Sequence, residues 1–304
     1  MTLENETERF SFPDFIDRMT AGIGGESLLI RGENRVALYD TGMAYCGGQL
    51  VENVREALGG GRLDYVILSH SHYDHIGALP DVIRAFPEAV VAGGAYCAHV
   101  FLREGARRTM VRMGRAAAEK YGGDPAAISA KGMRIDLILR EGDTIDLGGR
   151  TITAYEAPGH TRCSMAYMIE PEHILITSES SGILGGDGEM QPAVLKTRQG
   201  ALQTIEKCRT LQPERIICPH YGMVPVRYTE DYWDRGRKTI EEEHEFILGL
   251  LKEDLGMEQM LTRYREKYYR EERKDQQPLE ALLENARATI ALYAREEGKE
   301  IRQE

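Results

Sequence analysis

The sequence predicts an α+β fold over residues 1–226, followed by a helical extension over residues 227–304. Two observations support this prediction. Short strand-like runs alternate with helix-like segments as far as Pro225, which is typical of a mixed domain. Beyond that point no strand-like run occurs, and apolar residues recur at helical spacing instead. The 304 residues are enough for one large domain with an appendage.

Local patterns predict the elements of the first half. Segment 26–40 reads as two strands around a turn at 31–34. Leu50, Val54 and Leu58 recur every four residues before two glycines, which predicts a helix over 49–60. The later predictions are a strand over 63–69, a helix over 77–86, a strand over 88–93, and a helix over 95–121 broken near Gly105.

The second half predicts strands in quick succession and then helices. The strands cover 134–140, 143–149, 150–157, 164–170 and 173–178. A glycine-rich loop over 182–200, a helix over 201–212 and a strand over 214–222 follow. The extension reads as about three helices, and its acidic run 241–245 is expected to be a solvated helix face.

Composition narrows the class of protein. A net charge of −11 argues against nucleic acid as the main partner. No apolar run is long enough for a membrane span, and the polar, acidic N-terminus does not read as a signal peptide, so we expect a cytoplasmic protein without a membrane partner. The five cysteines are scattered and form no CxxC pair, so reduced thiols are expected.

The run "HSHYDH" directly after the strand over 63–69 is the strongest chemical signal. It places His70, His72, Asp74 and His75 within six residues. Residues two apart in extended backbone point the same way, so His70 and His72 are expected to converge. Imidazole and carboxylate donors suit zinc, iron or manganese.

Three further donors follow strands, and strand ends can meet at one edge of a sheet. They are His160 in "APGH", Glu179 in "TSE" and His220 in "CPH". Convergent histidines and carboxylates indicate a metal site. His99, His173 and His244 stand alone, so we expect them to be ordinary structural histidines.

These motifs together resemble the metallo-β-lactamase superfamily. Besides HxHxDH, the matching stretches are "LYDTG" at 38–42, "APGHT" at 157–161, "LITSES" at 175–180 and "CPHYG" at 218–222, in the family's order. The resemblance covers about residues 20–226. It implies an αββα sandwich with the metal site at one edge of the two sheets.

The resemblance implies two metal ions and their ligands. His70, His72 and His160 would bind the first ion, and Asp74, His75 and His220 the second. Zinc is the expected metal, with iron or manganese as alternatives. The family usually places a bridging aspartate where this chain has Glu179. The longer glutamate leaves open whether it bridges both ions, binds one, or weakens the second site.

The resemblance also suggests roles for residues that bind no metal. Asp40 would orient a ligand histidine through its other ring nitrogen, although an aspartate before "TG" is also a common turn former. Tyr221 could donate to a developing oxyanion, or it could be a packing aromatic. Asp74 could accept or relay a proton. The reaction implied is hydrolysis by metal-activated water.

A small-molecule thioester or ester is the expected substrate, because thioesterases of this family, namely glyoxalase II-like enzymes and an alkylquinolone-pathway thioesterase, carry C-terminal helices. The basic helix over 103–115 could meet an anionic substrate or be a solvated face, and loop 182–198 is expected to line the pocket. A lactonase, a phosphodiesterase and a non-catalytic regulator are the alternatives. Diiron oxygen reductases of the family carry glutamate where His72 stands, which disfavours that reaction. Broad apolar stripes in the extension suggest a homodimer.

Overall fold

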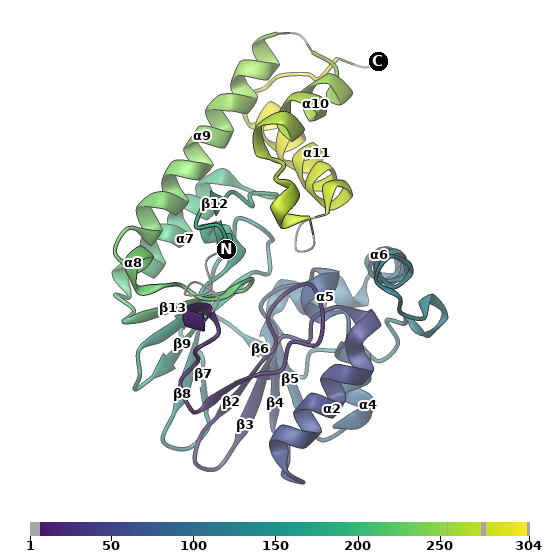
Figure 1. The fold of residues 1–304 in the computed structure, drawn as a ribbon, viewed down its shortest axis with the longest axis vertical. Helices are drawn as coiled ribbons and strands as arrows, with labels where there is room; N and C mark the ends of the chain where they lie inside the picture. Colours follow the sequence, from purple (N-terminus) through teal and green to yellow (C-terminus); the bar gives the residue numbers. More distant parts are fainter. Residues whose placement is uncertain (1–6, 254, 275–277, 303–304) are drawn as a thin grey trace.

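Two six-stranded sheets form the centre of the molecule over residues 7–253, 255–274 and 278–302, which the computed structural model describes (Figure 1). The first sheet has the strand order β1 (Ile16–Arg18), β2 (Leu28–Arg31), β3 (Val36–Tyr39), β4 (Tyr65–Ile67), β5 (Val90–Gly94), β6 (Leu137–Leu139). The second has the order β14 (Gly222–Met223), β13 (Arg215–Cys218), β10 (Ile174–Ile176), β9 (Met165–Glu170), β8 (Thr151–Glu156), β7 (Thr144–Asp146).

Alternation along the strands places each sheet between two apolar layers. In β2, Leu28 and Ile30 face the core between the two sheets, whereas Leu29 faces the helices outside the first sheet. In β10, Ile176 faces the same central core and Leu175 faces the opposite side. Successive side chains of a strand point to opposite faces, so strands buried on both faces are apolar throughout. The predicted αββα sandwich is confirmed.

Helices cover the outer faces of both sheets. The first sheet is covered by α2 (Gly47–Leu58), α3 (Tyr73–Ile76), α4 (Leu79–Ala85), α5 (Ala95–Leu102) and α6 (Glu104–Tyr121). Helix α7 (Arg198–Thr210) covers the second sheet. Helix α2 ends at Gly59, where φ is +57°, as the paired glycines predict.

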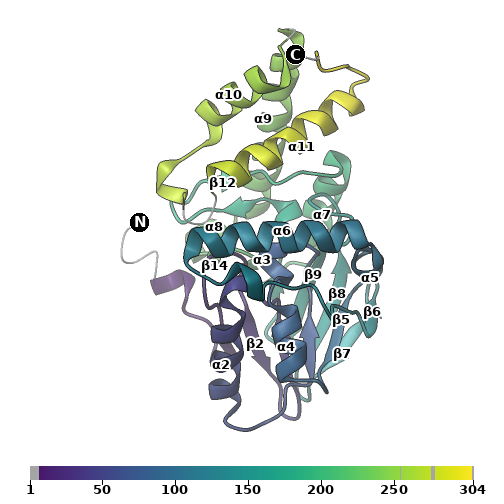
Figure 2. The same cartoon turned by 90° about the vertical axis from the view of Figure 1, so that its right-hand side faces the viewer.

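The extension consists of α8 (Val226–Thr229), α9 (Tyr232–Lys252), α10 (Met257–Tyr268) and α11 (Leu279–Glu296). These helices stand beyond one edge of the sandwich, and α6 crosses the body beneath them (Figure 2). Ile240 of α9 and Ile290 of α11 share one apolar core with Ile205 of α7. The extension is therefore packed on the helix that covers the second sheet, and the division of the chain at residues 226–227 stays a prediction.

Three local features differ from the sequence prediction. Strand β1 was not expected, and the loop predicted over 182–200 contains a short hairpin of β11 (Ile183–Leu184) and β12 (Met190–Gln191). The break between α5 and α6 falls at Arg103, whose backbone is extended, and not at Gly105. Strands of two or three residues are too short to show a periodic pattern, which is why β1 and the hairpin escaped prediction.

The expected solvated face over 241–245 is wrong at Glu243. This residue is only 1% exposed, because helical spacing puts it on the same face as Thr239 and Ile247. The Tyr264 hydroxyl donates to its Oε1 at 2.6 Å, and the Tyr293 hydroxyl donates to its Oε2 at 3.3 Å. One carboxyl group of α9 therefore contacts both α10 and α11.

No helix in the described part of the chain is both long and apolar enough to cross a membrane.

Glu243 should make the stability of the protein depend on pH. Burial raises the pKa of this carboxyl group to about 7. The folded state thus holds a proton that the unfolded chain releases near pH 4.5, so the free energy of unfolding falls as pH rises from about 4.5 to 7. Glu243→Gln should remove a penalty on the order of 3 kcal/mol at pH 8 and little at pH 4.5, measured by urea unfolding. Glu245→Gln, at an exposed position two residues away, is the control. An equal gain at both pH values would contradict this account.

Candidate metal centre

The predicted ligands lie together where strands of both sheets end. His70 and His72 follow β4, with His72 in extended backbone, and α3 begins at Tyr73, so Asp74 and His75 lie on its first turn. The other donors follow strands of the second sheet, namely His160 after β8, Glu179 after β10 and His220 after β13. The fold therefore brings together residues that are up to 150 positions apart in the chain.

Three overlapping groups of donors form within this cluster. Two of them match the predicted ligand sets, and the third joins His70, His75 and Glu179. The donor atoms of His70, His72 and His160 all lie within 4.8 Å of one another, and His160 Nε2 is 2.8 Å from His72 Nδ1. A second group joins Asp74, His75 and His220, with Asp74 Oδ2 3.7 Å from the Nε2 atoms of both histidines. Two nitrogen ligands on one tetrahedral zinc ion would lie about 3.3 Å apart, so both groups have the dimensions of a metal site.

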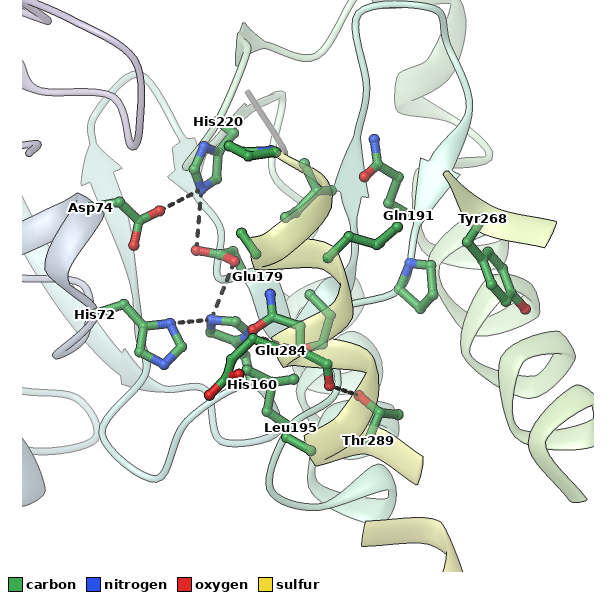
Figure 3. A pocket seen from close by; sticks show the side chains of 18 of the residues that line it. His72, Asp74, His160, Glu179, Gln191, Leu195, His220, Tyr268, Glu284 and Thr289 are labelled. Carbon is green, nitrogen blue, oxygen red and sulfur yellow. Dashed lines mark hydrogen bonds and ion pairs between the residues drawn. The ribbon is translucent and has the colours of Figure 1, made fainter. Parts of the chain in front are cut away.

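Glu179 lies between the two groups (Figure 3). Its Oε1 is 2.9 Å from His75 Nε2 and 3.5 Å from His220 Nε2, while its Oε2 is 3.2 Å from His160 Nε2. The side chain is 7% exposed. Both carboxylate oxygens thus face imidazole nitrogens. Because Oε1 also lies 3.5 Å from Nε2 of His70, this one oxygen is near members of both groups.

The donor set fits divalent cations. His70 Nε2 and Glu179 Oε1 are buried and have no hydrogen-bond partner among the described residues. Buried polar atoms without a partner are costly unless something else satisfies them. A cation between the imidazole nitrogens and the carboxylate oxygens would satisfy these atoms, and no hydrogen-bond donor within the described ranges does so.

Asp40 orients two of the ligand histidines. Its Oδ2 lies 2.9 Å from Nδ1 of His75, and it accepts the hydroxyl hydrogen of Ser69 at 2.6 Å. That hydroxyl in turn lies 2.9 Å from Nδ1 of His70. With Nδ1 hydrogen-bonded in each ring, Nε2 is left free to bind a metal. Asp40 has a φ of +48°, a conformation that aspartate tolerates better than most residues.

His160 is oriented by a backbone group instead. Its Nδ1 donates to the carbonyl oxygen of Ala193 at 2.7 Å. Gly25 leaves room for His75, because a Cβ at that position would lie 2.4 Å from the His75 ring. None of these partners was predicted from the sequence. Ser69 does stand directly before "HSHYDH", but no pattern of side chains indicates that the carbonyl oxygen of Ala193 contacts His160.

The electrostatics differ between the imidazoles of the site. Although burial disfavours their charge, Asp74 and Asp40 hold the pKa of His75 well above its usual range, and Glu179 raises the pKa of His220. Burial, and then the neighbouring His160, lowers the pKa of His72 to about 3. Burial also lowers the pKa of His70. Although burial disfavours its charge, Glu179 has a pKa well below its usual range because of the neighbouring imidazoles, first among them His160 and then His220. Neutral nitrogen lone pairs and a carboxylate are the forms that bind metal ions.

Tyr221 follows His220 with a φ of +62° and lines the cavity above the metal centre. Burial raises the pKa of its phenol to about 12, so the hydroxyl keeps its proton at neutral pH. The buried guanidinium of Arg9 donates to the carbonyl oxygens of Tyr221 at 3.3 Å and of Gly185 at 2.7 Å, and so holds the two loops together. The role of Arg9 was also not predicted from the sequence.

The isolated histidines do not join the metal centre. His173 lies beside Glu170 and Leu211, His244 packs against Tyr293, and His99 packs near Tyr96. Within the described part of the chain, none of the three belongs to a group of donors with metal-site dimensions, as the sequence predicted.

A cavity of about 1150 Å³ opens above the metal centre. His72, Asp74, Glu179 and His220 form part of its floor, and the walls come from α6, the β11–β12 hairpin and helices α9, α10 and α11. The prediction that loop 182–198 lines the pocket is confirmed. The extension therefore forms one wall of the space where a substrate would meet the metal centre.

Comparison with known proteins identifies the fold family. Residues 22–220 match the family model of the Metallo-beta-lactamase superfamily. The structure resembles a metallo-beta-lactamase family protein, TTHA1429 from Thermus thermophilus, with a TM-score of 0.64 and 18% identity over 94% of this chain and 95% of that one. At that identity the likeness shows the fold alone.

Two relatives differ in the reactions that their names describe. A coenzyme F420H(2) oxidase from Methanothermobacter marburgensis is 30% identical over 51% of this chain and 33% of its own length. An atrochrysone carboxyl ACP thioesterase from Pseudocercospora fijiensis is 27% identical over 53% of this chain and 38% of its own length. The match thus spans little more than a third of the length of these relatives.

Asp40→Asn should weaken metal binding. If its amide NH₂ group faced the Ser69 hydroxyl and His75 Nδ1, donors would face donors. His75, and His70 through Ser69, would then lose the hydrogen bonds that orient them. Loss of a residue that hydrogen-bonds to a metal ligand typically lowers metal affinity about 10–100-fold. The affinity can be measured by competition with a chromophoric chelator. Asp64→Asn is the control, since Asp64 accepts a backbone hydrogen bond from Val36 in the same sheet, away from the metal centre. Equal affinities for Asp40→Asn and wild type would contradict the role of Asp40.

The position of Glu179 predicts two metal ions per chain. Elemental analysis of the protein purified without chelators should find two ions in the wild type and fewer in Glu179→Gln, which has lost the shared charge. Glu179→Asp should show whether the longer side chain matters. Glu284→Gln, an exposed position lining the cavity, is the control. One ion in the wild type that rises to two in Glu179→Asp would mean that the glutamate weakens the second site.

Proposed function

The chain belongs to the metallo-beta-lactamase superfamily of metal-dependent hydrolases, and on that premise we propose that it cleaves a thioester or ester bond of a small molecule. The observation that carries the proposal is the pair of histidine groups that share Glu179 at the floor of a cavity walled by the chain's own C-terminal helices. Zinc is the metal we propose, because it suits neutral imidazole and carboxylate ligands.

The chain's own residues account for the remaining chemistry. Divalent ions, when bound, would lower the pKa of water and polarise a carbonyl oxygen. In this proposal, His70, His72 and His160 would hold one ion, Asp74, His75 and His220 would hold the other, and Glu179 would supply a carboxylate to the same centre. Asp74 lines the cavity at the metal centre and its side chain is 22% exposed, so in this proposal it can also accept a proton. The protonated phenol of Tyr221 can donate to the oxyanion that forms from the ester carbonyl.

The cavity favours a substrate with a sizeable apolar acyl group. Its volume slightly exceeds the ~300–1,000 Å³ usual for small-molecule sites. Four methionines line it, which gives an adaptable apolar wall: Met43, Met110, Met113 and Met190. Arg103 and Arg112 of the basic α6 region also line it, so that helix can meet an anionic part of the substrate.

The match to the F420H(2) oxidase makes a redox enzyme the competing proposal. His72 favours hydrolysis, because the oxygen-reducing members that the sequence resembles carry glutamate there. A lactonase or phosphodiesterase would use the same centre on a different substrate. We also propose a cytoplasmic location, since all five cysteines are free thiols, and a homodimer, which a one-chain mass in light scattering would overturn.

Hydrolysis of thioesters should depend on the metal. A panel of acyl thioesters, aryl esters, lactones and phosphodiesters should show the highest kcat/KM for a thioester or ester. Dialysis against a chelator should abolish turnover, and added zinc should restore it. Chelator-treated protein to which magnesium is added is the control. Turnover that survives complete metal removal, or no turnover of any panel member by protein carrying two ions, would contradict the proposal.

A further inference from the structure

The segment 192–197 lies between the metal centre and the C-terminal extension. On one side it contacts the peptide around His160: Ala193 accepts from His160 Nδ1 at 2.7 Å, and the Lys196 amide donates to the Gly159 carbonyl at 2.9 Å. This segment has no regular secondary structure between β12 and α7. Its position is therefore set by its contacts, and any displacement would move the carbonyl that orients His160.

On its other side the segment is held by α11. The Thr289 hydroxyl lies 2.8 Å from the carbonyl oxygen of Val194 and 3.0 Å from that of Asn285 in its own helix. The hydroxyl of a threonine within a helix can donate to the carbonyl oxygen four residues earlier in its own helix. Here the shorter contact is to the loop. Thr289 is 2% exposed and Val194 is fully buried, so water does not replace this contact.

Apolar packing places the same segment in the core of the extension. Val194 belongs to the cluster that contains Leu282 and Ile290 of α11. Figure 3 shows α11 passing in front of His160, with Leu195 and Thr289 beside it. Two adjacent carbonyl groups thus accept hydrogen bonds from opposite sides. The carbonyl oxygen of Ala193 accepts from His160, and that of Val194 accepts from Thr289 of the extension.

We propose that Thr289 is a positioning residue for the metal ligand His160 and acts through the peptide segment Ala193–Val194. The extension then supports the metal centre as well as walling the cavity. Because binding linkage is reciprocal, metal binding should also hold α11 in place. This inference rests on the metal centre and not on the reaction, so it stands or falls separately from the proposed hydrolysis.

The test compares three variants by the affinity of the folded protein for zinc, measured by competition with a chromophoric chelator. Thr289→Val keeps the shape and removes the donor, and it should weaken the binding of at least one zinc ion by about tenfold, the lower end for outer partners of metal ligands. Thr289→Ser keeps the donor and should recover affinity to within about twofold of wild type. Thr262→Val in α10 is the matched control, because its hydroxyl contacts only its own helix at Glu258.

Each alternative result overturns the proposal. Unchanged zinc affinity in Thr289→Val would show that the hydroxyl does not position His160. Equal losses in Thr289→Ser and Thr289→Val would show that the donor is not the cause, and an equal loss in Thr262→Val would show a general loosening of the extension. A lost hydrogen bond that only stabilised the fold would lower the melting temperature and leave zinc affinity unchanged.

A measurement on the wild type keeps the test decisive if Thr289→Val does not fold. Hydrogen exchange of the backbone amides over 286–293 should slow when zinc is added to the metal-free protein, because metal binding at His160 holds the segment that α11 contacts. Amides over 50–58 of α2, which covers the other sheet, serve as the internal control. Exchange in α11 that does not change with zinc, while the chain binds zinc, would overturn the proposal.

Discussion

The convergence of buried metal-binding groups at one edge of the sandwich is the constraint on which the rest of the structure depends. Five imidazoles and two carboxylates meet there. Taking such polar groups out of water costs free energy, so their orientations have to be set by further hydrogen bonds and by close packing. Asp40 with Ser69, the Ala193 carbonyl and the space left by Gly25 all serve this purpose.

The sandwich supplies this rigidity through its two sheets. Strands buried on both faces cannot shift register without exposing apolar side chains, so the ends of β4 and β13 are fixed in space. Ligand loops that begin at such ends are short and well anchored. Asp40 follows β3 of the first sheet and contacts residues that follow its parallel neighbour β4. Because β3 and β4 are paired side by side, Asp40 just after β3 lies close enough to orient His70 and His75, which follow β4.

The extension turns an open metal centre into a cavity. Relatives of the superfamily share the sandwich but carry names as different as an oxidase and a thioesterase, so the sandwich alone does not select a reaction. In this chain α9, α10 and α11 bring charged, polar and aromatic side chains over the ligands, whereas the methionines of the cavity come mainly from α6 and β12. The same helices share a core with the loop that orients His160, so the walls of the cavity and the geometry of the centre are built together.

The sequence by itself determined the kind of fold and the ligand types, because these depend on local spacing. Alternating apolar runs identified most strands, and "HSHYDH" identified the centre. Only the tertiary structure decided how the ligands are held. Ser69 meets Asp40 across 29 residues, His160 meets the Ala193 carbonyl across 33, and Thr289 meets that of Val194 across 95. It also reversed the expectation for Glu243, because a charge pattern shows helical spacing but not what packs against that face. Contacts to backbone carbonyls between distant segments depend on packing, and no local pattern of side chains encodes them.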